Sequence, residues 1–121
     1  MKLPSDISAV FERATCIYNK TEVEAALDHM ADDIRQELAD KNPLLLVTMI
    51  GGMVPAGHLV TRLDFPLDMN YVHATRYRGD IVGRDLIWKT EPTFSVDQRV
   101  VLVIDDILDG GVTLKAIIDY C

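Results

Sequence analysis

The chain has 121 residues, enough for one domain with a sizeable core, and hydrophobic residues make up 49% of it. It has 12 basic and 19 acidic residues, a net charge of −7 and a pI near 4.7. This balance excludes a non-specific nucleic-acid surface or an anionic-membrane surface, because both require clustered Lys and Arg. We therefore expect a single domain over residues 1–121 that binds neither nucleic acid nor membrane.

The N-terminal sequence and the cysteines predict the compartment. The first residues lack the apolar core of a signal peptide, and no apolar run approaches the roughly 18 residues of a membrane span. Cys16 and Cys121 are the only cysteines and have no metal-ligand spacing. Two reduced thiols in a cytoplasmic protein are the favoured interpretation, and a disulfide between them is the weaker alternative.

Two helices are predicted in the N-terminal part of the chain. The first covers about residues 7–17, with Ser5 or Asp6 as its cap. The second begins at the capping-box pattern from Thr21 to Glu24. It continues as an amphipathic helix whose apolar face consists of Val23, Leu27, Met30, Ile34 and Leu38.

Strands and helices alternate in the rest of the chain. Strands are expected over residues 44–49, 69–77, 85–89 and 100–104, and helices over residues 55–63, with Pro55 in the first turn, and from Val112 or Thr113 to the C-terminus. Residues 100–104 are all apolar and mostly β-branched, which is typical of a central strand covered on both faces. Such alternation predicts an α/β fold with a mostly parallel, twisted sheet flanked by helices.

The strand over residues 100–104 leads into acids, glycines and a hydroxyl. Asp105 and Asp106 follow it directly, and Gly110, Gly111 and Thr113 come just before the last helix. Ligands bind at such carboxyl ends of parallel strands, and N–H groups at a helix N-terminus bind phosphate. The alternative is an ordinary turn whose acids cap the helix. Neither G-x-G-x-x-G nor a Walker lysine motif is present.

The segment from Val101 to Leu114 resembles the phosphoribosyl pyrophosphate (PRPP) motif of type I phosphoribosyltransferases. Residues 47–57, 65–67 and 71–77 resemble the hypoxanthine-guanine branch in its bacterial purine-salvage form. The resemblance runs from about Thr21 to the last residue. It implies the type I phosphoribosyltransferase core with its C-terminal part missing, because the family continues into strands that contact the base.

The resemblance also implies a reaction. The family uses Mg²⁺ and transfers the 5-phosphoribosyl group of PRPP to hypoxanthine or guanine, giving IMP or GMP and pyrophosphate. The transition state has oxocarbenium character at the sugar, so the site needs carboxylates, donors for pyrophosphate and a base for the purine proton. Family members are expected to form homodimers or homotetramers.

Three acids receive roles from the resemblance. Asp105 and Asp106 bind the ribose hydroxyls and contact the metal indirectly, through those hydroxyls or water, and Asp109 is the general base at the purine N7. Burial of Ile107 and Leu108 is expected to fix this loop and raise the pKa of Asp109. The alternatives are solvated loop acids for the pair and a helix N-cap for Asp109.

The 5′-phosphate is expected on residues 109–113, namely Asp109, Gly110, Gly111, Val112 and Thr113. Gly110 departs from the family, which more often has Thr or Glu at that position. We therefore predict that Gly110→Thr tightens phosphate binding, and equal PRPP dissociation constants would contradict this.

Two further segments complete the expected site. Ile50, Gly51 and Gly52 align with the pyrophosphate loop, where isoleucine supplies no charge and only backbone amides carry over. The family often has a non-proline cis peptide in this loop, and whether the Ile50–Gly51 bond is cis stays open. The alternative to a pyrophosphate-binding loop here is a plain turn between a strand and a helix. Arg76 and Tyr77 begin the family's flexible loop; Tyr77 matches the pattern, while Arg76 replaces a serine and is either a pyrophosphate contact or a surface residue.

Other functions remain open alongside this one. A non-catalytic PRPP-binding or nucleotide-binding domain or regulator, or a truncated inactive form, would retain the same acids. Adenine or orotate specificity is a third possibility. His29, His58 and His73 share no spacing and are interpreted as structural.

Overall fold

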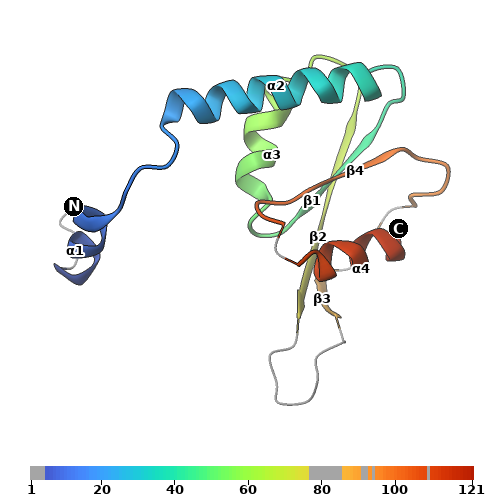
Figure 1. The fold of residues 1–121 in the computed structure, drawn as a ribbon. Helices are drawn as coiled ribbons and strands as arrows, with labels where there is room; N and C mark the ends of the chain where they lie inside the picture. Colours follow the sequence, from blue (N-terminus) through green and yellow to red (C-terminus); the bar gives the residue numbers. More distant parts are fainter. Residues whose placement is uncertain (1–4, 77–85, 91–92, 94, 109) are drawn as a thin grey trace.

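The computed structural model describes residues 5–76, 86–90, 93, 95–108 and 110–121. Its elements in chain order are α1 (Ser5–Arg13), α2 (Lys20–Leu38), β1 (Leu44–Thr48), α3 (Met53–Val60), β2 (Asp68–Arg76), β3 (Leu86–Thr90), β4 (Val101–Ile104) and α4 (Val112–Tyr120) (Figure 1). The predicted alternation of strands and helices is confirmed, with boundaries that agree to within four residues.

The described strands form one sheet in the order β3-β2-β1-β4. Strand β1 pairs in parallel with β2 on one side and with β4 on the other, and β3 pairs antiparallel with β2. The sheet is therefore mostly parallel, as predicted. Parallel pairing also brings the carboxyl ends of β1, β2 and β4 to the same edge of the sheet.

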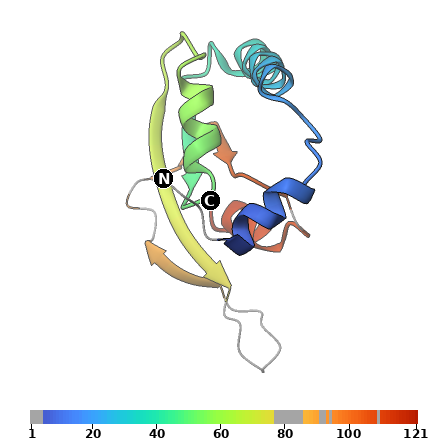
Figure 2. The same ribbon diagram turned by 90° about the vertical axis from the view of Figure 1, so that its left-hand side faces the viewer.

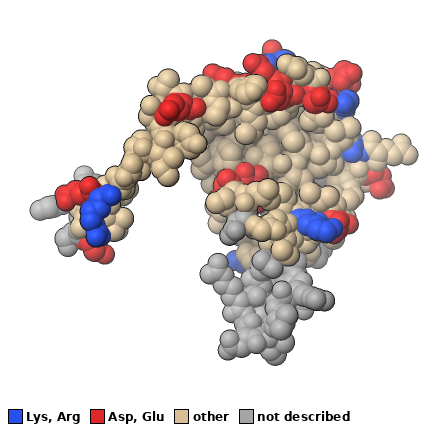
Figure 3. Space-filling view, viewed as in Figure 1, with Lys and Arg blue, Asp and Glu red and all other residues tan. Residues whose placement is uncertain are grey.

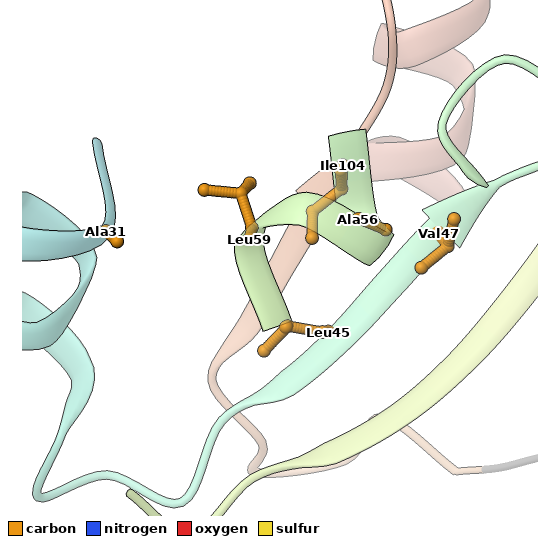
Figure 4. Close-up of a cluster of buried hydrophobic side chains, with 6 residues drawn as sticks. All are labelled: Ala31, Leu45, Val47, Ala56, Leu59 and Ile104. Atoms are coloured by element: carbon orange, nitrogen blue, oxygen red, sulfur yellow. The ribbon is translucent and has the colours of Figure 1, made fainter. Parts of the chain in front are cut away.

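Helices cover both faces of this sheet. Leu45 and Val47 of β1 point to the face covered by α2 and α3, where the buried cluster also contains Ala31, Ala56, Leu59 and Ile104 (Figure 4). Leu46 of β1 points the other way and packs with Val72 and with Ile117 of α4. Figure 2 shows the arrangement from a second side. Alternate residues of one strand thus serve two layers, which explains its uninterrupted apolar sequence.

Strand β4 is less buried than its sequence predicts. All five residues of β1 are buried, whereas β4 lies at the edge of the described sheet and Val101, Leu102 and Val103 are only partly buried. The expectation of a central strand covered on both faces is wrong for β4 among the described strands. Strand β1 has a strand on each side, whereas β4 has one, which leaves β4 more accessible.

Helix α2 starts earlier than the predicted capping box. Its N-cap is Asn19, whose side chain accepts a hydrogen bond from Glu22 N at 2.9 Å, while Asn19 N donates to Glu22 Oε2 at 2.7 Å. The reciprocal bonds expected from Thr21 and Glu24 are therefore made by Asn19 and Glu22. An asparagine cap with Glu at the third helical position satisfies the same donors.

Glu24 contributes to the attachment of α2 instead. Arg62, just after α3, makes ion pairs with Glu24 and with Asp28, the latter at 2.7 Å. A third ion pair joins Arg35 of α2 to Asp64 at 2.9 Å. Its hydrogen bond from Arg35 lowers the pKa of Asp64. Acidic side chains gather along α2, which lies at the top of Figure 3. These ion pairs hold α2 to the chain that follows α3.

The other helices refine the prediction. Helix α1 ends at Arg13 rather than near residue 17 and stands apart from the sheet and its covering helices (Figure 1). Helix α3 begins at Met53, so Pro55 lies in its first turn as expected. Cys16 and Cys121 are both free and exposed. Among the described residues, no helix has the length and apolar character needed to cross a membrane.

Candidate functional site

A cavity of about 270 Å³ opens where the carboxyl ends of β1 and β4 meet the start of α4. The predicted site residues that line it are Gly51, Asp105, Asp106, Gly111 and Thr113. They come from two loops 54 residues apart in the chain and from the first turn of a helix. The parallel pairing of β1 and β4 is what brings them together.

The two loops touch at Gly51 and Asp106. A Cβ atom added to Gly51 would lie 2.4 Å from Cγ and from Oδ2 of Asp106. The carboxylate of Asp106 thus occupies the space that any other side chain at position 51 would need. The expected pyrophosphate loop and one expected ribose acid are direct neighbours.

The second glycine lies deeper. Gly52 is buried, and its N–H donates to the carbonyl of Thr48 at 2.9 Å. An added Cβ would lie 2.6 Å from the carbonyl oxygens of both Thr48 and Ile104. Gly52 therefore supports the loop from beneath and does not line the cavity.

Ile50 faces away from this cavity. Its side chain is 65% exposed, and the residue lines a separate, mainly apolar cavity between α2 and α3, together with Gly51 and Asp106. A non-proline cis peptide is present in this loop, but it joins Met49 to Ile50, one bond before the Ile50–Gly51 bond whose state the sequence left open.

Asp105 and Asp106 have different surroundings. Asp105 is partly buried, and its Oδ1 accepts the backbone N–H of Asp106 at 2.9 Å. Asp106 is exposed and faces Gly51. One acid is thus partly engaged by its own loop, and the other borders the neighbouring loop.

The first turn of α4 provides backbone donors. Gly111 is the N-cap, with φ of +68°, and the first helical hydrogen bond runs from Lys115 N to Gly111 O at 2.8 Å. The N–H groups of Val112, Thr113 and Leu114 therefore have no partner within the helix, which favours an anion near the cavity. Gly110 and Val112 are exposed and do not line the cavity themselves.

The loop between β4 and α4 differs from expectation in two ways. Ile107 and Leu108 are 71% and 73% exposed, so their predicted burial is wrong. The expected rise in the pKa of Asp109 depended on that burial and therefore has no support. Because Gly111 is the N-cap, the alternative of an N-cap at Asp109 is also wrong.

Some predicted residues lie outside what the structure describes. Asp109 and Tyr77 are not among the described residues, so their proposed roles stay predictions. Arg76 is the last residue of β2, and its side chain is likewise not described.

Sequence reasoning missed Thr48 and Ala74, which also line the cavity. Thr48 is the one buried polar side chain among the described residues, and its Oγ1 donates to the carbonyl of Ile104 at 3.0 Å. The available signal was a hydroxyl at the carboxyl end of a buried strand, directly before a glycine loop. Ala74 has no comparable signal.

The described residues that line the cavity give it a negative charge. Asp105 and Asp106 are its charged residues, and none of the described lining residues is Lys or Arg. The described residues contain no group of three or more side chains suited to hold a metal ion. Two carboxylates, backbone amides and a hydroxyl suit a phosphorylated sugar that brings a cation with it.

Sequence comparison gives a consistent family. Residues 14–121 match the phosphoribosyl transferase domain. The chain is 25% identical over 103 residues to the hypoxanthine-guanine-xanthine phosphoribosyltransferase of Tritrichomonas foetus, covering 85% of this chain and 56% of that protein. It is 28% identical over 99 residues to the hypoxanthine-guanine phosphoribosyltransferase of Streptococcus pneumoniae, covering 81% and 55%. The chain thus spans about half the length of the curated relatives it matches.

Solved structures agree on the fold. A hypoxanthine phosphoribosyltransferase from Staphylococcus aureus superposes with a TM-score of 0.81 at 17% identity, over 98% of this chain and 64% of that one. A hypoxanthine-guanine phosphoribosyltransferase from Bacillus anthracis superposes with a TM-score of 0.77 at 16% identity, over 88% and 62%. Together with the family match over residues 14–121, these similarities show that the chain belongs to the phosphoribosyl transferase domain family.

Proposed function

We propose that this protein binds PRPP and transfers its 5-phosphoribosyl group to a purine base in salvage. The observation that carries the proposal is the junction of the two loops, where the Asp106 carboxylate lies directly against Gly51 in one cavity. In PRPP the pyrophosphate is attached to C1 of the ribose, next to the carbon that carries the 2′-hydroxyl. A loop that binds pyrophosphate and a loop that binds the ribose hydroxyls must therefore lie side by side.

Each part of PRPP has a matching group. Asp105 and Asp106 are proposed to accept hydrogen bonds from the ribose 2′ and 3′ hydroxyls and to place negative charge near the positive sugar. The free N–H groups at the start of α4 and the Thr113 hydroxyl are proposed to hold the 5′-phosphate. The backbone amides of Ile50 and Gly51 are proposed to bind pyrophosphate, while the Gly52 amide donates to the Thr48 carbonyl and supports the loop.

Mg²⁺ is the proposed cofactor. Pyrophosphate carries several negative charges, and the described lining of the cavity supplies carboxylates but no Lys or Arg. Mg²⁺ in nucleotide sites is held by one or two carboxylates plus substrate phosphates. Asp105 and Asp106 would hold it, directly or through ribose hydroxyls and water, and the ion would neutralise the leaving group.

The proposed base is hypoxanthine or guanine. Relatives at 25% and 28% identity are named for hypoxanthine, guanine and xanthine, and their similarity extends over most of this chain. We further propose a cytoplasmic location, in keeping with the two free, exposed cysteines, and assembly as a dimer or tetramer.

The direct test is an assay with PRPP, Mg²⁺ and each of hypoxanthine, guanine, xanthine and adenine, with nucleotide and pyrophosphate measured together. Nucleotide formation with hypoxanthine or guanine supports the proposal. PRPP binding without product from any base would instead support a non-catalytic PRPP-binding domain. Absence of PRPP binding would contradict both.

Asp109 is proposed as the base that takes the purine proton. Replacement by asparagine keeps the size and removes the basic carboxylate, so Asp109→Asn is expected to lower kcat by about 100-fold or more with little change in PRPP affinity. An unchanged kcat would remove Asp109 from this role.

A further inference from the structure

We infer that Thr48 is a positioning residue that holds the pyrophosphate loop, residues 50–52, against the two acids that follow β4. The inference rests on the proposed function, since it assigns a role within the same PRPP site. Thr48 lies at the end of β1, beneath the cavity, and its hydroxyl would affect ligand binding by holding the two loops in place.

The hydroxyl joins the two strands where their backbone pairing stops. The last paired residues of β1 and β4 are Val47 and Ile104. One residue further on, the Thr48 Oγ1 donates to the Ile104 carbonyl at 3.0 Å. The next N–H of this strand, that of Met49, donates to Val72 of β2 at 2.8 Å. The Thr48 side chain therefore continues the link to β4 beyond the last paired residues, while the backbone remains paired with β2.

The pyrophosphate loop packs against the hydrogen bond between Thr48 and Ile104. Gly52 N donates to the Thr48 carbonyl at 2.9 Å. A Cβ on Gly52 would lie 2.6 Å from the Ile104 carbonyl oxygen and 3.0 Å from the Thr48 Oγ1. The loop is thus packed directly on the donor and on the acceptor of the bond.

The acids lie on the other side of it. Ile104 immediately precedes Asp105, and the Asp106 carboxylate lies against Gly51. A shift of the Ile104 carbonyl would therefore change the separation between the acids and the loop. Thr48 is 6% exposed, so water has little access to replace its hydroxyl.

The affinity of a ligand that contacts both loops depends on the separation between them. The affinity of a ligand that contacts only the loop after β4 does not. PRPP carries ribose, 5′-phosphate and pyrophosphate, whereas ribose 5-phosphate lacks the pyrophosphate. Loss of the Thr48 hydroxyl should therefore weaken PRPP selectively. A general loss of folding would weaken both ligands together.

The test compares wild type with Thr48→Val, Thr48→Ala and Thr48→Ser. Valine keeps the shape and removes the hydroxyl, alanine removes it without a branched side chain, and serine retains it. Dissociation constants for PRPP and ribose 5-phosphate are measured by calorimetry with Mg²⁺, and thermal unfolding establishes that each variant is folded. Either hydroxyl-free variant suffices if the other does not fold.

The hydroxyl-free variants are expected to bind PRPP about tenfold more weakly, because small misplacements of a binding group are costly. Their affinity for ribose 5-phosphate should stay within about twofold of wild type, and Thr48→Ser should restore PRPP binding to a similar margin. Unchanged PRPP affinity, an equal loss for both ligands, or failure of serine to restore binding would overturn the inference. Failure of the wild type to bind PRPP would overturn the proposed function, a result visible without any variant.

Discussion

Strands β1 and β4 are both short apolar runs, yet they differ in burial. Every residue of β1 is buried, whereas three of the four residues of β4 are partly exposed. The loops that follow differ in the same way: Gly52 is enclosed by backbone oxygens, whereas a Cβ added to Gly110 would meet no atom within 4 Å from the described residues beyond its chain neighbours. The expected pyrophosphate side of the site thus rests on a tightly packed support, and the expected phosphate side is open.

One cavity thus combines a tightly packed loop with an open one. A packed loop keeps backbone amides in place before a ligand arrives, which reduces the ordering cost of binding. An open glycine-rich loop leaves room for a ligand to approach the helix N-terminus closely. Three predictions address this difference, and a fourth concerns the attachment of α2.

The largest effect is expected in the core of β1. Leu45 is fully buried between the sheet and α3, so Leu45→Ala should lower the free energy of unfolding by about 2 to 5 kcal/mol. The matched change Leu102→Ala in the partly buried β4 should cost about 1 kcal/mol. Urea denaturation measures both. Equal costs would show that β4 is as well packed as β1 and would break the comparison.

The next effect concerns the loop after β1. Gly52→Ala places a Cβ 2.6 Å from two backbone oxygens, which cannot rotate away as a side chain can, so it should cost about 1 to 3 kcal/mol. Gly57→Ala is the control, because no atom of another described element lies within 4 Å of the added Cβ and alanine favours helix α3, giving a gain of about 0.5 to 1 kcal/mol. Calorimetric unfolding compares the two variants. A neutral Gly52→Ala would mean that the loop is not tightly supported.

A smaller effect is expected at Gly110 in the open loop. Space is available there, but φ is +63°, a conformation that suits glycine and asparagine and penalises a β-branched residue. Gly110→Thr should therefore lower the free energy of unfolding by about 1 kcal/mol, a cost separate from the tighter phosphate binding predicted for the folded protein. Gly110→Asn is the better-tolerated control. Thermal unfolding and PRPP calorimetry on both variants separate the conformational cost from any ligand contact.

The smallest effect concerns the ion pair that holds α2 over the sheet. The hydrogen bond from Arg35 lowers the pKa of Asp64 in the folded state. The stability it contributes is therefore present above the unfolded pKa of Asp64 and is lost as the pH falls through the lower folded value. Asp64→Asn should reduce the loss of stability between about pH 5 and pH 3. Unfolding curves at several pH values measure it, and an unchanged pH dependence would show that the exposed pair contributes nothing.

Much of the fold follows from sequence pattern. The buried run 44–48, the Asp68–Arg76 strand and the helix starting at Val112 were all predicted within a few residues, because apolar periodicity and glycines mark these elements strongly. The capping box was placed two residues too late. Asn19 and Thr21 are both good N-caps followed by Glu at the right spacing. In the structure Asn19 is the cap, and Glu24 pairs instead with Arg62, 38 residues away.

The site was only partly predictable. Gly51, Asp105, Asp106, Gly111 and Thr113 were identified by motif and do share a cavity. Thr48 was missed because a threonine inside an apolar run is common in strands and its partner, the Ile104 carbonyl, is 56 residues away. The burial of Ile107 and Leu108 was wrong since apolar character does not tell on which side of a loop a residue lies.

The sequence by itself determined the family, the α/β alternation and the identity of the acids and glycines, because these depend on local periodicity and on a contiguous motif. Only the tertiary structure decided that β1 is central and β4 an edge among the described strands, and that Gly51 meets Asp106 while Thr48 reaches Ile104. Those contacts arise from the parallel pairing of strands more than 50 residues apart, and pairing partners are chosen by packing over the whole sheet, which no local segment encodes.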